Sequence, residues 1–280
     1  MIKTLKKLTL ITTVAILSLG TAFAGTPTKS VDNCKNNCNS CSLHDLALSG
    51  TLNVEYLNNF TFRGTVLDTN PVLRPGLSLS LPLPLGGSLF DSTSLELSVA
   101  QALASKGSTG RWSRTDASVG VAAVKGDLKV TTSYQVVTSP NNSFNTADGV
   151  SVRLDYDDSG SNSFLPTLNP HVEAYFGLNN NPGNNTKNGS AVGNYYEVGI
   201  EPSTKVSGVK VSVPVNVGFG AGNYYTGNKS YGYTSAGVKL SKEIAANTDL
   251  YGGVTYLNSG DGVNANKNNW LTSVGLRYSF

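Results

Sequence analysis

Three cysteines near the N-terminus have the spacing of a metal- or cluster-binding motif. They lie in the stretch CKNNCNSC as Cys34, Cys38 and Cys41, and His44 follows shortly after. The spacing C-x3-C-x2-C is the one with which radical-SAM enzymes hold an iron–sulfur cluster. Thiolates together with an imidazole also suit Zn²⁺ or Cu⁺. The compartment that these thiols reach decides which chemistry is open to them.

The first residues indicate export. Lysines in residues 1–7 precede an apolar run over 8–19, and Ala22-Phe23-Ala24 then fits a small-x-small cleavage site. The apolar run is shorter than the about 20 residues that a membrane-spanning helix needs. We therefore predict that residues 1–24 are a cleaved signal peptide.

Export places the thiols in an oxidising compartment, which excludes the radical-SAM interpretation and favours a disulfide. Cys34 paired with Cys38 or with Cys41 would leave one odd thiol. The alternative is a metal site of Cys34, Cys38, Cys41 and His44, which the polar leader of residues 25–45 would frame only weakly. We expect no cofactor, and no stoichiometric tight binding when the mature protein is titrated with zinc or copper.

Composition excludes two further classes. The chain has 21 Lys and Arg against 18 Asp and Glu, and three of the basic residues fall in the signal peptide, so the mature chain is close to neutral. It lacks the basic footprint of a nucleic-acid-binding protein. Charged residues make up only 14% of the chain, against about 25% in a typical soluble domain. After the signal peptide, no apolar run approaches the length of a transmembrane helix.

Strict alternation of apolar and polar residues begins at Leu46 and recurs to Phe280. A period of two is the pattern of a β-strand with one apolar face. The alternating segments are 46–56, 77–81, 95–99, 119–123, 128–136, 150–156, 172–176, 196–200, 209–219, 236–240, 250–256 and 270–280. We predict that residues 46–280 form an all-β fold, a transmembrane antiparallel β-barrel of about 12 strands with up-and-down meander topology.

The connections between segments alternate in length. Long stretches rich in Asn and Gly, such as 57–72, 179–193 and 257–269, alternate with shorter links, of which Gly126-Asp127 is a two-residue hairpin turn. Only 157–167 is longer than this scheme requires. Long loops at one end and short turns at the other, with an even number of strands, are typical of outer-membrane barrels.

Charge placement favours a barrel in lipid over a soluble β-sandwich. The apolar faces carry no charged residue, and in lipid an outward Arg or Lys at the midplane costs roughly 2–4 kcal/mol. We predict that the charged residues of the opposite faces, with one histidine, line the pore: Glu55, Glu96, Lys129, Arg153, Asp155, His171, Glu173, Glu197, Glu201, Lys210, Lys239 and Arg277. Aromatic residues at the segment ends would form girdles at the two interfaces with water: Tyr56, Phe176, Phe219, Tyr256 and Trp270 at the outer rim, and Tyr156, Tyr278 and Phe280 at the inner rim.

A stretch near the start of the predicted barrel resembles the TorF family of porin-like outer-membrane proteins. In that family an aromatic-x-Phe-Arg-Gly element stands at the end of the first strand, matched here by Phe60, Phe62, Arg63 and Gly64. A Pro-x-Leu-x-x-Gly element follows and is matched by Pro71, Leu73 and Gly76. The resemblance implies an outer-membrane barrel whose cargo is unsettled. The ending VGLRYSF also resembles a terminal signal that the barrel assembly machinery recognises through Phe280.

The lumen is the predicted functional surface. A barrel of this strand number has a backbone diameter of roughly 24 Å, so side chains would leave a narrow passage or a packed interior. Lumen charges of both signs could pair across strands or form separate acidic and basic walls, and the sequence leaves both open. No local partner motif accompanies His171, so we expect no enzyme activity and no catalytic residue.

We expect a passive channel for small hydrophilic solutes, surrounded by outer-membrane lipid in a Gram-negative bacterium. The alternative is a non-conducting barrel that acts in ligand binding, adhesion or as a scaffold. A hydrolase that uses His171 is a weaker third hypothesis.

Overall fold

The computed structural model of the chain describes residues 48–85, 87, 89–104, 112–142, 144–159, 167–179, 192–225, 229–261 and 263–280. The predicted signal peptide and leader, with Cys34, Cys38, Cys41 and His44, lie outside these residues. Among the residues described, no helix is long and apolar enough to cross a membrane.

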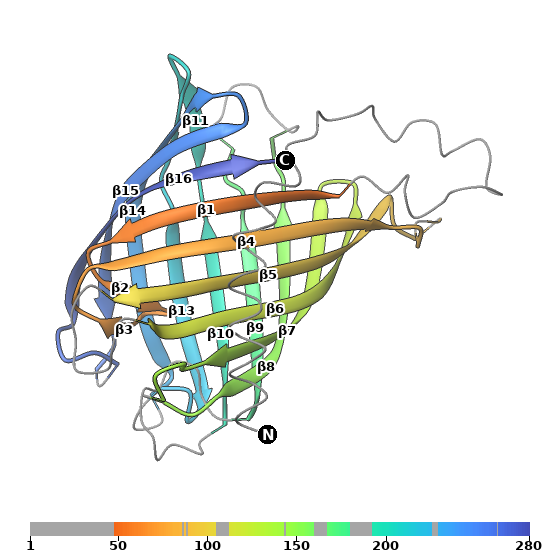
Figure 1. The fold of residues 1–280 in the computed structure, drawn as a ribbon. Coiled ribbons are helices and arrows are strands. Elements are labelled where there is room, and N and C mark those ends of the chain that lie inside the picture. Colours follow the sequence, from red (N-terminus) through yellow and green to blue (C-terminus); the bar gives the residue numbers. More distant parts are fainter. Residues whose placement is uncertain are drawn as a thin grey trace.

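The fold is a closed barrel of 12 antiparallel strands (Figure 1). Its strands are β1 (Ser49–Leu57), β4 (Val72–Leu83), β5 (Ser92–Ala104), β6 (Trp112–Lys125), β7 (Leu128–Thr138), β8 (Ala147–Tyr156), β9 (His171–Asn179), β10 (Gly193–Ile200) continued by β11 (Ser203–Val206), β12 (Val209–Ser212) continued by β13 (Val215–Gly222), β14 (Tyr231–Ala245), β15 (Thr248–Ser259) and β16 (Asn268–Ser279). Each strand pairs with its neighbours in the chain, and β1 pairs with β16 to close the ring. The predicted strand number and meander order are confirmed.

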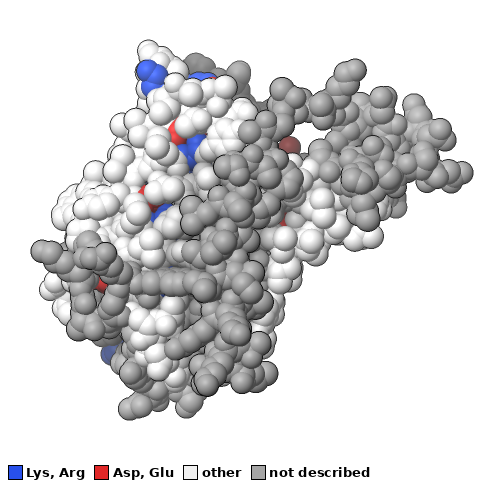
Figure 2. Space-filling model, viewed as in Figure 1, with Lys and Arg blue, Asp and Glu red and all other residues white. Residues whose placement is uncertain are grey.

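Side chains alternate between the two faces of the barrel as the sequence predicts. Apolar residues of the predicted lipid face are exposed on the outside, for example Val54, Val119 and Leu276. The described surface visible in Figure 2 is nearly all uncharged, with only a few Lys, Arg, Asp and Glu side chains in view. Aromatic residues also pack on the outside near strand ends, where the rings of Tyr256 and Trp270 are 5.1 Å apart.

One end of the barrel has mostly tight turns. The Gly126-Asp127 turn joins the paired residues Lys125 and Leu128, as predicted. Ser207 and Gly208, which join β11 and β12, both have positive φ, the conformation of a type I′ hairpin turn. The long connection 157–170 is the exception at this end. Its residue Thr167 forms a β-bridge with Ser203, the first residue of β11. Thr167 thereby pairs with an edge of β11 that no barrel strand pairs with among the described residues.

Prolines interrupt two neighbouring strands at the same level. Pro202 separates β10 from β11, and Pro214 separates β12 from β13, because proline has no N–H to donate to a neighbouring strand. The carbonyl of Pro202 still accepts a hydrogen bond from the N–H of Val213 at 2.8 Å. The segment 209–219, predicted as one uninterrupted strand, is therefore split.

Candidate functional site

A short hairpin occupies the connection between β1 and β4. Strands β2 (Phe60–Phe62) and β3 (Thr65–Asp68) pair with each other and with no barrel strand. Arg63 and Gly64 form the turn with φ of 47° and 78°, which is the type I′ pattern. The Phe-Arg-Gly element was expected at the end of the first strand, and that expectation was wrong. Strand β1 ends at Leu57, and the element forms a hairpin of its own.

This hairpin lies inside the barrel. Its tip contacts Gln135 of β7, Glu173 of β9 and Ser259 of β15, which come from widely separated strands of the ring. Nearer the base of the hairpin, the ring of Phe60 packs with Val72, Ala102 and Ala104. A segment can contact strands around a closed ring in this way only from its interior. The stretch predicted as a polar surface connection is thus an inward fold that narrows the lumen.

Arg63 anchors the tip of the hairpin. Its Nη2 lies 2.9 Å from Oε1 of Glu173 and donates a hydrogen bond of 3.0 Å to Oε1 of Gln135. Its guanidinium carbon lies 4.0 Å from the ring centroid of Tyr175 and 4.9 Å from that of Tyr195, within cation–π range. The side chain is only 8% exposed, so this charge is neutralised and enclosed by the barrel wall.

Five tyrosines, two of which contact the Arg63 guanidinium through their rings, surround the hairpin tip. This tyrosine cluster consists of Tyr175, Tyr195, Tyr224, Tyr225 and Tyr233, and Val66 of β3 packs against it. The hydroxyl of Tyr225 donates a hydrogen bond of 2.8 Å to the carbonyl of Arg63. A Cβ at Gly64 would overlap the ring of Tyr233, so the close approach of hairpin and wall requires glycine there.

Five of the twelve residues predicted to line the pore gather in one charged cluster on β8, β9 and β10. Arg153 pairs with Asp155 at 2.8 Å and approaches Glu173 at 3.8 Å. His171 lies 3.4 Å from Glu197, which also accepts hydrogen bonds from the hydroxyls of Tyr195 and Tyr233. Lys129 stands opposite Asp155 in the strand register. The charges of this wall are therefore paired, within β8 and between neighbouring strands, and are not separated into acidic and basic walls.

The other predicted lining residues lie apart from this cluster. Glu201 accepts a hydrogen bond from Ser212 and lies 3.5 Å from Lys239, close to Lys210 at the proline-interrupted end. Glu96 accepts hydrogen bonds from Ser80 and Ser94. Glu55 stands opposite Arg74 in register, and the guanidinium of Arg277 lies over the ring of Tyr251. The structure does not bring these residues together into one site.

Sequence reasoning missed a second charged group beside the hairpin. Arg74 lies on β4, and Arg114 and Asp116 lie on β6, all on the interior face. The predicted segments began only at Leu77 and Val119, although the same alternation extends back past these residues. Pro75 weakens the strand pattern at that point, since proline is rare inside a sheet. Carrying the alternation backward from Val119 to Ala117 and Thr115 would have placed Arg114 and Asp116 on the interior face.

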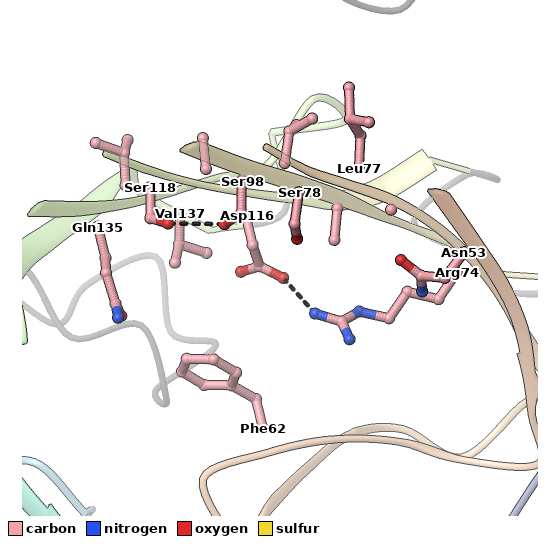
Figure 3. A pocket seen from close by; sticks show the side chains of 15 residues that line it. Asn53, Phe62, Arg74, Leu77, Ser78, Ser98, Asp116, Ser118, Gln135 and Val137 are labelled. Atoms are coloured by element: carbon pink, nitrogen blue, oxygen red, sulfur yellow. Dashed lines mark hydrogen bonds and ion pairs between the residues drawn. The ribbon is translucent and has the colours of Figure 1, made fainter. Parts of the chain in front are cut away.

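An open cavity of about 270 Å³ remains between the hairpin and the wall formed by β1 and β4–β7. In Figure 3, Arg74, Asp116 and the serines of this wall point into the cavity, and Phe62 of the hairpin faces them from the other side. Among the described residues, the tyrosine cluster thus fills one side of the lumen, and the cavity lies on the side of small polar residues.

The structure supplies no evidence for a metal centre in the barrel. Within the described ranges, no group of three or more His, Cys, Asp or Glu side chains could hold a metal ion. The candidate ligands Cys34, Cys38, Cys41 and His44 lie outside those ranges, so their predicted state stays a prediction.

Comparisons with known proteins support the fold. No family model and no curated protein matches the chain, so the TorF resemblance is not confirmed. Among solved structures, an outer-membrane channel from Pseudomonas putida F1 aligns with a TM-score of 0.51 and 11% identity, over 84% of this chain and 96% of that chain. A NanC porin aligns with a TM-score of 0.46 and 12% identity over 83% and 99% of the two chains. Outer membrane phospholipase A from Escherichia coli aligns with a TM-score of 0.46 and 11% identity over 83% and 92%.

These similarities define a class of architecture. The chain has the fold of an outer-membrane channel barrel, and identities this low carry no information on cargo or activity. A similarity of fold alone leaves the assignment of function to the site itself.

Proposed function

We propose that this protein is an outer-membrane porin that allows passive passage of small hydrophilic solutes. The observation that carries the proposal is the polar cavity beside an inward-folded hairpin, inside a barrel with an apolar exterior. A lipid-facing exterior with a polar interior is the arrangement of bacterial outer-membrane barrels. The resemblance of residues 53–79 to the TorF family supports the same function and is part of the proposal.

The environment of His171 gives no support to the enzyme alternative. Its Nε2 faces Glu197, whose other oxygen is occupied by two tyrosine hydroxyls, and no serine hydroxyl is hydrogen-bonded to the imidazole among the described residues. A histidine that activates a nucleophile needs one within hydrogen-bond reach. We propose that His171 serves only as a hydrogen-bond partner of Glu197, and hydrolase assays that compare the His171→Ala variant with the parent would test this.

Conductance is the direct test of the proposal. The refolded protein should produce stepwise currents in planar bilayers and should let liposomes swell in small sugars. Because the interior charges are mostly paired, we expect weak selectivity between potassium and chloride. If the folded protein gives neither current nor swelling, the proposed porin function is refuted.

The hairpin itself favours a second candidate function, a non-conducting barrel that binds a ligand or partner. Its anchored tip and the tyrosine cluster close one side of the lumen. Failure to conduct together with retained ligand binding would support this candidate over the porin.

Export and assembly are also part of the proposal. We propose that residues 1–24 are removed and that the barrel assembly machinery recognises Phe280 at the end of β16. Mass spectrometry of the protein from outer-membrane fractions should give a mature chain that begins at Gly25. Deletion of Phe280 should lower the folded amount in that fraction.

A further inference from the structure

The cavity owes its size to small side chains. On the interior face, β4 presents Gly76 and Ser78, β5 presents Ser98, and β6 presents Ser118. Ser98 and Ser118 share a hydrogen bond of 2.7 Å between the two strands. The cavity of about 270 Å³ has room for a solute of a few carbon atoms.

The charged groups of the cavity are only loosely paired. Arg74 Nη2 lies 3.7 Å from Oδ2 of Asp116, which is too long for a hydrogen bond. The other oxygen of Asp116 is taken at 2.7 Å by Nε of Arg114, whose guanidinium lies over the Phe62 ring. By contrast, Arg63 and Glu173 are in close contact at 2.9 Å. The pair in the cavity can therefore separate without the loss of a hydrogen bond.

Two polar atoms of this pair have no hydrogen-bond partner among the described residues. They are the donor Nε of Arg74 and the acceptor Oδ2 of Asp116, and both are buried. An unsatisfied buried polar atom is costly, and such atoms are rare in native structures. A solute inserted between the two side chains would satisfy both if it offered an acceptor to Arg74 and a donor to Asp116.

The charges define the chemistry of that solute. A bare cation would be repelled by Arg74 and Arg114, and a bare anion would leave Oδ2 of Asp116 without a donor. A carboxylate suits Arg74, since guanidinium and carboxylate form charge-assisted hydrogen bonds. A hydroxyl or ammonium group on the next carbon would then lie within reach of Asp116. The amides of Asn53 and Gln135 and the ring of Phe62 complete the lining for the remainder of a small molecule.

We propose that this cavity is a selectivity site for small carboxylates that carry a hydrogen-bond donor on the α-carbon, either α-hydroxy acids or α-amino acids. The inference deepens the proposed porin function by naming a solute class. The site itself depends only on Arg74, Asp116 and the space between them, so it can be tested by binding, without conductance.

The test uses propionate, lactate and alanine, which differ only in the group on the α-carbon. Binding to the detergent-folded protein is measured by ligand-observed saturation-transfer NMR titration. We expect lactate, alanine or both to bind on the order of tenfold more tightly than propionate, the effect of one hydrogen bond to a charged group. Preference for lactate alone would identify α-hydroxy acids, and preference for alanine alone would identify α-amino acids.

Two variants separate the two roles. Asp116→Asn should remove the preference over propionate, and Arg74→Gln should weaken the binding of all three acids. Charge-matched controls away from the cavity are Asp127→Asn in the β6–β7 turn and Lys205→Gln in β11, which should leave binding unchanged. Heat-modifiable migration on gels checks that each variant is folded.

Equal binding of the three acids by the parent protein would overturn the inference, and so would a preference that survives Asp116→Asn. Bilayer currents are recorded on the same preparations. Preferential binding without current would refute the proposed porin function and support the proposed binding site. Current without preferential binding would refute the binding site and support the porin function.

Discussion

Replacement of Arg63 with alanine removes the side chain that fastens the hairpin to the far wall of the barrel. The variant loses the 2.9 Å contact with Glu173, the 3.0 Å hydrogen bond to Gln135 and the cation–π contacts with Tyr175 and Tyr195. It also leaves Glu173 with one remote cation, because Arg153 Nη1 is 3.8 Å away. We expect the docked position of the hairpin to be strongly weakened while the barrel stays folded.

The size of the effect follows from burial. Removal of one partner from a buried ion pair costs about 3–5 kcal/mol. Every 1.4 kcal/mol is about a tenfold change in an equilibrium constant, so docking should weaken on the order of a hundred- to a few-thousand-fold. Four contacts that involve the backbone of the hairpin remain in the variant. Tyr225 donates to the carbonyl of Arg63, and Ser259 donates to the carbonyl of Gly64. Asn264 donates to the carbonyl of Gly64 and accepts from the N–H of Val66. Each contributes roughly 0.5–1.5 kcal/mol, so the hairpin should exchange between docked and released positions.

Single-channel recording detects this exchange. Arg63→Ala should show a second, larger conductance level and more current noise than the parent protein. Arg63→Lys should be intermediate, because lysine keeps the charge and loses the planar stacking on tyrosine. Thr65→Ala, in the same hairpin, is the matched control. If Arg63→Ala has the conductance and noise of the parent, the anchor does not hold the hairpin and the reasoning is wrong.

Three further predictions concern the turn, the lipid face and a connection outside the barrel wall. Gly64→Ala should mimic Arg63→Ala in bilayer recordings, since Gly64 has φ of 78° and an added Cβ would overlap the Tyr233 ring. Val119→Arg, on the outer face of β6, should lower the free energy of unfolding in vesicles by about 2–4 kcal/mol in urea titrations, and Val119→Leu should not. The pKa of Asp158 is held below its usual value because the N–H groups of Asn169 and Leu168 donate to it. That contribution to stability is complete above the unfolded pKa of about 3.9 and is lost as pH falls through the lower folded value. The gap in urea midpoint between parent and Asp158→Asn should therefore be constant at neutral pH and shrink below about pH 4; a gap that grows on acidification would contradict the assignment.

The strands could be predicted from the sequence because lipid imposes a simple rule on them. Every second residue faces hydrocarbon, so alternation marks the strand and its register at once. The first and last residues of the strands were harder to predict, because the alternation weakens at prolines. Because Pro75 lies in the first part of β4, that part of the strand and Arg74 were not predicted. Pro214 divides a run of alternating valines that was predicted as one strand.

The inward hairpin could not be predicted by the same rule. Residues 57–72 are polar and irregular, and a surface loop has the same composition. What places the hairpin inside is the contact of Arg63 with Gln135 and Glu173, residues 72 and 110 positions away in the chain. The Arg63-Gly64 pair between short runs rich in Thr, Phe and Val was a local indication of a hairpin, and nothing in that pattern gives its direction. Likewise, pairing of the lumen charges depends on cross-strand neighbours, which only the register defines.

The position of the hairpin has a consequence for biogenesis. It directly follows β1, the strand that must wait for β16 before the ring is sealed, and Asn58 at its base bonds to the backbone of Trp270 and Thr272 in β16. Its contacts with Tyr224, Tyr225 and Asn264 are made with segments that are synthesised much later. The hairpin can therefore dock first on β7 and β9, and its docking is completed only when the last strands are in place and β1 pairs with β16.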